Sequence, residues 1–138
     1  MRILLVTILD ITDKSNPIYH GVEYYRMVKP MAVLRRIHPE YDLSIIPKSV
    51  FEFDNISDEQ REIKTEFINQ QLESNDLVLM NRDVHEDVVN LILKSGKPFG
   101  LDLDDYWHLP GDHELKGHYE EFRISEKTEN AIKHANFV

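Results

Sequence analysis

Five short apolar runs alternate along this chain with stretches of helical periodicity, and this alternation limits the folds that it can adopt. The runs cover residues 2–9, 41–47, 76–80 and 99–103, and a fifth opens at 136–138. The first run is continuously apolar, which is typical of a parallel strand covered on both faces. The alternation predicts a parallel sheet with helices on both faces. We therefore expect one α/β, doubly wound, Rossmann-like domain over residues 1–138, three layers deep (αβα), with strand order 3-2-1-4-5.

Helix-capping residues, glycine and proline indicate where the helices begin and end. Ser57-Asp-Glu-Gln60 is a predicted capping box for a helix through about Glu73. Gly96, followed by Pro98, predicts the end of the next helix. Pro30 lies inside the helical stretch that follows Gly21 and removes one helical hydrogen bond, so we expect a kink or a break near Val28-Lys29.

Composition excludes several classes of partner. The net charge of -9 argues against nucleic acid or an anionic membrane as the main partner. A local basic patch can override that repulsion, and Arg35-Arg36 is the only adjacent basic pair. The chain has no cysteine, so it forms no disulfide, and we expect a cytoplasmic protein. No apolar run approaches the ~20 residues of a membrane span, so we expect no integral membrane segment.

Polar and aromatic side chains gather directly after the fourth apolar run. They are Asp102, Asp104, Asp105, Tyr106, Trp107 and His108. Ligands of α/β proteins bind at the carboxyl ends of the strands, so this cluster is the candidate site. Tyr106 and Trp107, the latter the only tryptophan, can form a stacking platform for a sugar ring or a lid over the strand ends. His108 is either a general base near neutral pH or a solvated loop residue.

The aspartates of this cluster have three interpretations. Hard carboxylate oxygens can hold Mg²⁺. One buried carboxylate can instead take a proton from a substrate hydroxyl. In the third interpretation, one Asp caps the following turn and another is solvated. Strand alternation places Asp102 and Asp104 on one face and lets Asp105 begin the turn.

The expected strand order brings a second segment to this site. With order 3-2-1-4-5, the loops after the first and fourth strands, residues 10–21 and 102–113, face each other. Gly21 then starts a helix whose unpaired N–H groups favour a phosphate or another anion. Arg26, farther along the same helix, can pair with the carboxylates or with a ligand phosphate.

Three segments, residues 21–31, 101–110 and 131–138, resemble the amino-terminal half of GT-B glycosyltransferases. The closest likeness is to group 1 (family 4-like) enzymes, which carry an Asp/Trp segment after the fourth strand. The last segment is similar to their passage into the fifth strand, with Asn136 where Asp is usual. The resemblance covers this chain but only that half of such an enzyme, so we expect the amino-terminal part of a two-domain protein.

The resemblance implies a function and roles for the site residues. In that family the amino-terminal domain holds the acceptor, the other domain holds the nucleotide-sugar donor, and transfer occurs between them, usually without a metal. Asp104, Asp105 or His108 would be the acceptor-side base. Gly21 would lie near the donor diphosphate, and Tyr25 and Arg26 would line the cleft.

The expected function is therefore acceptor binding in a glycosyltransferase that moves a sugar to a hydroxyl, with no cofactor and no activity of this chain alone. Asp102, Tyr106 and Trp107 complete the expected substrate-binding set. The alternative is a non-catalytic α/β module that binds a glycan or a protein. A metal-dependent phosphotransfer or hydrolase domain is disfavoured, because Asp-x-Asp in phosphatases of the haloacid dehalogenase type follows the first strand.

Overall fold

A four-stranded parallel sheet forms the centre of the molecule. The computed structural model describes residues 1–7, 9–10, 18–19, 24–81, 84–103 and 107–138. Its main strands are β1 (Arg2–Thr7), β4 (Asp42–Pro47), β5 (Leu77–Asn81) and β6 (Phe99–Asp102), which lie in the order β4-β1-β5-β6. All three pairings are parallel. Two short strands, β2 (Leu9–Asp10) and β3 (Ile18–Tyr19), pair antiparallel to each other.

The α/β class and the parallel sheet are confirmed, but the expected strand order is wrong. In chain order the four main strands are arranged 2-1-3-4, not 3-2-1-4-5. The fifth run contributes an isolated parallel bridge from Phe137 to Gly100 rather than a full strand. A methyl group at Gly100 would overlap the Phe137 ring, so this close approach requires a glycine. Because β4 lies on one side of β1 and the later strands β5 and β6 lie on the other, the direction of winding reverses between β1 and β5.

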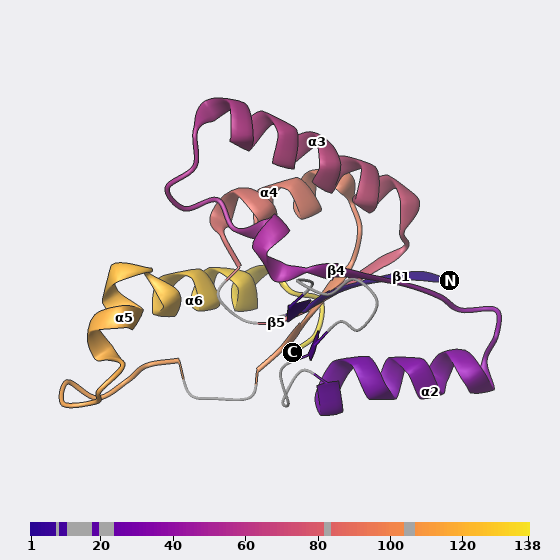
Figure 1. The fold of residues 1–138 in the computed structure, drawn as a ribbon, viewed down its shortest axis with the longest axis horizontal. Helices are drawn as coiled ribbons and strands as arrows, with labels where there is room; N and C mark the ends of the chain where they lie inside the picture. The colour runs from indigo at the N-terminus through magenta and orange to yellow at the C-terminus, as the bar shows by residue number, and fades with distance from the viewer. Residues whose placement is uncertain (8, 11–17, 20–23, 82–83, 104–106) are drawn as a thin grey trace.

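Helices cover both faces of the sheet (Figure 1). One face carries α3 (Asp58–Ser74), α4 (Glu86–Ser95) and α6 (Ile124–His134), which α5 (Lys116–Glu121) precedes. The opposite face carries the π-helical turn η1 (Tyr24–Val28) and α2 (Lys29–Ile37). A 3-10 turn, η2 (Lys48–Phe51), follows β4. None of the described helices is long and apolar enough to cross a membrane.

Two apolar clusters of unequal size hold these layers together. Strand alternation in β1 sends Leu4 and Val6 to one face and Leu5 to the other. The larger cluster joins the sheet to α3, α4 and α6 and includes Val78, Met80 and Phe99. In the smaller cluster, Leu5 packs with Met27 and Val28, which fixes η1 against the sheet. The smaller cluster therefore determines where the start of α2 lies.

The residues predicted to begin α3 and to end α4 do so in the structure. Ser57 Oγ accepts a hydrogen bond from Gln60 N at 3.2 Å, and Gln60 Oε1 accepts one from Ser57 N at 3.0 Å. Gly96 ends α4 in the left-handed conformation, with φ of 68°. The sequence predicts a kink or a break near Val28-Lys29; at that point the π-helical turn η1 gives way to α2, with Val28 itself in helical conformation.

Candidate functional site

Arg26 joins the start of the α2 layer to the end of β6. Its guanidinium donates to both carboxylate oxygens of Asp102, with Nη2 to Oδ1 at 2.6 Å and Nε to Oδ2 at 3.0 Å. Nη2 also donates to the carbonyl oxygen of Leu103 at 3.1 Å. Charge-assisted contacts of this bidentate kind fix both distance and orientation. Of the two partners considered for Arg26, a carboxylate of the Asp cluster or a ligand phosphate, the structure shows a carboxylate, that of Asp102.

Arg26 and Asp102 lie side by side, but the expected strand order does not account for their contact. Most of the loop 10–21 lies outside the described residues, so its position opposite residues 102–113 stays a prediction. β1 and β6 are not neighbours, since β5 separates them. η1 packs against the sheet face that carries Leu5. In that position the Arg26 side chain reaches Asp102 at the end of β6. Tyr25, the neighbour of Arg26, is 66% exposed. We call the group of Tyr25, Arg26 and Asp102 the corner.

The far side of the β6 loop is held by α6. Ser125 Oγ donates a hydrogen bond to the Trp107 carbonyl oxygen. His108 Nε2 lies 2.7 Å from a carboxylate oxygen of Glu129, and both side chains are about half exposed. Arg26 therefore holds Asp102 and Leu103, and α6 holds Trp107 and His108. Gly21, Asp104, Asp105 and Tyr106 lie outside the described residues, so their roles stay predictions.

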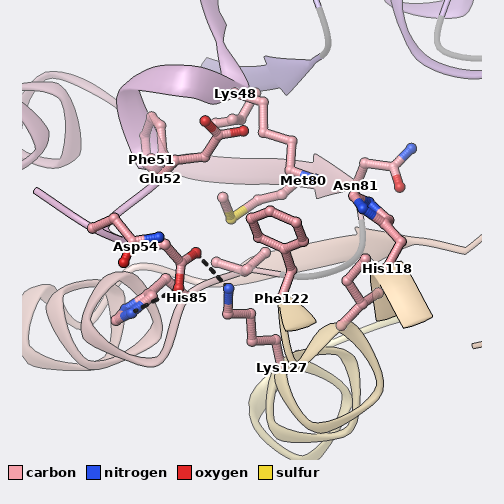
Figure 2. A pocket seen from close by; sticks show the side chains of 14 residues that line it. Lys48, Phe51, Glu52, Asp54, Met80, Asn81, His85, His118, Phe122 and Lys127 are labelled. Carbon is pink, nitrogen blue, oxygen red and sulfur yellow. Dashed lines mark hydrogen bonds and ion pairs between the residues drawn. The ribbon is translucent and has the colours of Figure 1, made fainter. Parts of the chain in front are cut away.

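A pocket of about 300 Å³ lies at the carboxyl edge of the sheet, where the direction of winding reverses (Figure 2). Val6 of β1 and Met80 and Asn81 of β5 form its floor. Parallel α/β sheets bind ligands at this reversal point, and the volume is at the small end of the usual range for ligand pockets. The lining includes none of the site residues that the sequence analysis named. Its polar and aromatic members include Lys48, Phe51, Glu52, Asp54, Asn81, His85, His118, Phe122 and Lys127.

A buried lysine organises the charges of this pocket. Lys127 of α6 is 6% exposed, and its Nζ lies 2.5 Å from Asp54 Oδ2. Lysine is rarely buried unless it is paired, because desolvation of its charge costs several kcal/mol. The second oxygen of Asp54 lies 3.9 Å from His85 Nε2. Asp54 therefore connects the loop after η2 to both α6 and the start of α4.

The tautomer of His85 follows from its position at the N-terminus of α4. Its Nδ1 accepts a hydrogen bond from Asp87 N at 3.2 Å, so that nitrogen carries no proton. A neutral His85 ring must then carry its proton on Nε2, the atom that lies toward Asp54. The Phe53 ring stacks on the imidazole with centroids 5.8 Å apart, which holds this orientation. His85 thus presents an N–H donor at the pocket.

Donors, acceptors and an aromatic ring surround the empty volume. Figure 2 shows Lys48, Phe51 and Glu52 on one side and Phe122 and Lys127 on the other. The His118 and Phe122 rings are tilted, with centroids 4.8 Å apart. Carboxylates accept hydrogen bonds from hydroxyl groups, and an aromatic face suits the C–H face of a sugar ring. The arrangement therefore suits a small ligand rich in hydroxyl groups.

Sequence reasoning missed this pocket because it relied on the wrong strand order. Asn81 is the last residue of β5 as Asp102 is of β6, so a polar residue at the end of an apolar strand is the signal that could have identified it. The remaining polar members come from five separate segments and meet only through tertiary packing. Within the ranges that the structure describes, no group of three or more His, Asp or Glu side chains could hold a metal ion.

No protein-family model matches the chain, and a search of the curated proteins finds no match. Among solved structures, the chain is similar to a conserved protein from Enterococcus faecalis V583, with 11% sequence identity and a TM-score of 0.46. That similarity covers 100% of this chain and 91% of the other. What the fold and the pocket define is a class: a parallel α/β domain with a polar pocket at the carboxyl edge of its sheet.

Proposed function

We propose that the chain is the acceptor-binding domain of a GT-B glycosyltransferase, which moves a sugar from a nucleotide-sugar to a hydroxyl group. The observation that carries the proposal is the bidentate contact of Arg26 with Asp102. It joins residues 21–31 to residues 101–110, two of the segments that resemble this family, at the edge where ligands of α/β sheets bind. The donor would be held by a second domain, so this chain alone would not transfer sugar.

His108 and Glu129 supply the chemistry that this function needs on the acceptor side. A carboxylate that is hydrogen-bonded to an imidazole orients the ring and stabilises the imidazolium form. His108 would take the proton of the acceptor hydroxyl as its oxygen attacks the sugar carbon and the nucleotide diphosphate leaves. The predicted bases Asp104 and Asp105 stay alternatives to His108 for this step.

The pocket at the reversal of winding supports acceptor binding. Its volume of about 300 Å³ admits a monosaccharide. Asp54 and Glu52 would accept hydrogen bonds from sugar hydroxyls, His85 Nε2 would donate one, and Phe122 would contact the ring. Tyr25 and Arg26 would line the cleft toward the donor, with Gly21 near its diphosphate.

Two titrations of the purified chain test this proposal. Calorimetry with a panel of mono- and disaccharides detects binding anywhere, and Trp107, the only tryptophan, reports binding near the start of α6 by its fluorescence. We expect saturable binding of at least one saccharide and none of UDP-glucose or GDP-mannose. Glu52→Gln should weaken saccharide binding about ten-fold, because it removes a carboxylate that lines the pocket and would accept hydrogen bonds from the sugar. The matched control is Asp42→Asn, whose carboxylate makes an exposed 3.8 Å contact with Arg35.

Either of two results would contradict the proposal. One is that the folded chain binds no saccharide. The other is that Glu52→Gln and Phe122→Leu both leave saccharide affinity at the level of the Asp42→Asn control.

A non-catalytic module that binds a glycan or a protein is the second candidate. It is favoured by one observation, that the pocket lining contains none of the predicted catalytic residues. The encoding DNA discriminates between the two candidates. A reading frame that continues past Val138 into a second βα domain supports the transferase, and a stop codon at that point supports the module.

A further inference from the structure

The layer that holds Arg26 also carries an unusual concentration of positive charge. Residues 24–37 contain four basic residues and no acidic one. Because the whole chain has a net charge of -9, the remaining residues together carry -13. Arg35-Arg36, the only adjacent basic pair in the chain, belongs to this segment. The charge of the molecule is therefore strongly asymmetric.

Apolar side chains on the outside of the same segment form a stripe. Tyr25, Val33 and Ile37 are 66%, 38% and 63% exposed. Their spacing in multiples of four residues aligns them along one side of the helix, with Lys29 between them. Lys29 Nζ lies 5.4 Å from the centroid of the Tyr25 ring, which places these two residues side by side. We call Tyr25, Lys29, Val33, Arg36 and Ile37 the α2 face.

Among the residues that the structure describes, the acidic groups near this helix leave Lys29, Arg35 and Arg36 exposed. Arg26 is directed at Asp102, on the sheet side of the helix. Arg35 makes a 3.8 Å contact with Asp42, and both side chains are at least 60% exposed. Glu40, beyond the end of the helix, lies 3.1 Å from His38. The acidic residues of the long helix α3 lie on the opposite face of the sheet from α2 (Figure 1).

We propose that the α2 face docks on an anionic lipid bilayer, with α2 lying in the plane of the interface. Helices that do so carry basic residues beside exposed apolar and aromatic ones. Tyrosine is enriched at the level of the lipid headgroups. Figure 1 shows α2 at the edge of the molecule, on the far side of the sheet from α3 and α4. A single helix at the edge of the molecule can lie along a flat anionic surface over its whole length.

The acidic remainder of the chain does not prevent this contact. α3 is separated from α2 by the sheet, which corresponds to two packing distances of about 10 Å each. At 0.1 M salt the Debye length is about 10 Å, so charges at that depth are largely screened from the bilayer. The proposal is also independent of glycosyl transfer, because bilayer binding requires no catalysis and no saccharide.

Co-sedimentation of the purified chain with vesicles tests the proposal. One set contains phosphatidylcholine alone, and the other contains phosphatidylcholine with phosphatidylglycerol. We expect binding to the anionic vesicles only, and weaker binding as the salt concentration rises. Each basic residue near an anionic surface contributes about 1 kcal/mol, or about five-fold in affinity. Lys29→Gln and Arg36→Gln should therefore weaken binding about 25-fold together.

A matched double variant controls for net charge. Lys94→Gln with Lys133→Gln removes two exposed basic residues from α4 and α6, on the other face of the sheet, and should leave vesicle binding unchanged. Ile37→Ser should weaken it without changing the net charge. Absence of binding to anionic vesicles, or equal effects of the two double variants, would overturn the proposal. A change in oligomeric state on Ile37→Ser, measured by sedimentation, would overturn it too, since a second copy would then cover the α2 face.

Discussion

Lys127 and Asp54 illustrate how single residues shape the candidate pocket. Lys127 is buried in α6, whereas Asp54 lies in the loop between η2 and α3 and keeps 36% of its side chain exposed. The contact joins segments 73 residues apart in the chain. A buried ammonium group without a partner would be costly. The ion pair with Lys127 therefore holds the Asp54 carboxylate at the rim of the pocket. The pocket thereby gains a carboxylate in a fixed position.

Lys127→Met should destabilise the protein by about 2 kcal/mol, because it removes a charge-assisted hydrogen bond and leaves Asp54 without its ammonium partner. Urea unfolding measures this loss as a change in the free energy of unfolding. The matched control is Lys116→Met, since Lys116 makes an exposed 3.5 Å contact with Glu120 one helical turn away. That variant should change the free energy of unfolding by less than about 0.5 kcal/mol. Equal losses in the two variants would contradict the role given to Lys127.

Asp76 links the beginnings of two strands and should make stability depend on pH. The backbone N–H of Arg2 donates to its carboxylate at 2.7 Å, and the Arg2 guanidinium donates at 3.0 Å. These contacts, the backbone one first, hold the pKa of Asp76 below its ordinary value of 3.8. A carboxylate whose pKa is lowered by folding stabilises the protein above its unfolded pKa. That stabilisation disappears as the pH falls through the lower, folded pKa.

Asp76→Asn should therefore be less stable than the wild type near neutral pH, and the difference should shrink as the pH falls below 3.8. Glu40 also has a lowered pKa and contributes in the same direction. The difference between wild type and variant at each pH isolates Asp76, because Glu40 is present in both. Urea unfolding at a series of pH values provides the measurement. A difference that stays constant through the acid range would show that the Asp76 carboxylate is not the titrating group.

At the scale of single elements, the sequence predicted the helix ends that depend on neighbouring residues. The Ser57–Gln60 capping box and the glycine end of α4 depend on residues within one turn of each other. The change of helix type at Val28-Lys29 lies beside Pro30, which lacks an N–H. The π-helical form of η1 was not predicted, because apolar spacing alone does not distinguish it from the first turns of an α-helix.

Strand order was beyond the reach of the same reasoning. A continuous apolar run predicts that β1 is buried on both faces, which Leu4 and Leu5 confirm with 0% exposure each. Such a run does not specify which strands lie beside it, since β4, β5 and β6 are all short and apolar. The choice depends on how the intervening helices pack. The site prediction therefore found Arg26 and Asp102 together but missed the pocket beside β1 and β5.

At the scale of the whole molecule, the two faces of the sheet are covered unequally. Among the described residues, one face packs against three helices through the larger apolar cluster. The other packs against η1 and α2 through Leu5, Met27 and Val28, and no residue of α2 itself is buried. Regions with few buried apolar contacts open locally at a lower free energy than the whole protein unfolds. We therefore expect the α2 layer to open separately from the rest of the fold.

Two neighbouring leucines of β1 provide a matched test of this difference. Leu4 and Leu5 are both fully buried, but Leu4 belongs to the larger cluster and Leu5 to the smaller. Each Leu→Ala substitution should cost about 3 kcal/mol in the free energy of unfolding. Native-state hydrogen exchange should separate them. Leu5→Ala should speed exchange of the α2 amides, because it removes the anchor of η1, whereas Leu4→Ala should speed exchange in α3 and α4 and change α2 little. If both variants accelerated α2 exchange by the same factor, the two faces would unfold as one unit, and the α2 layer would have no separate opening.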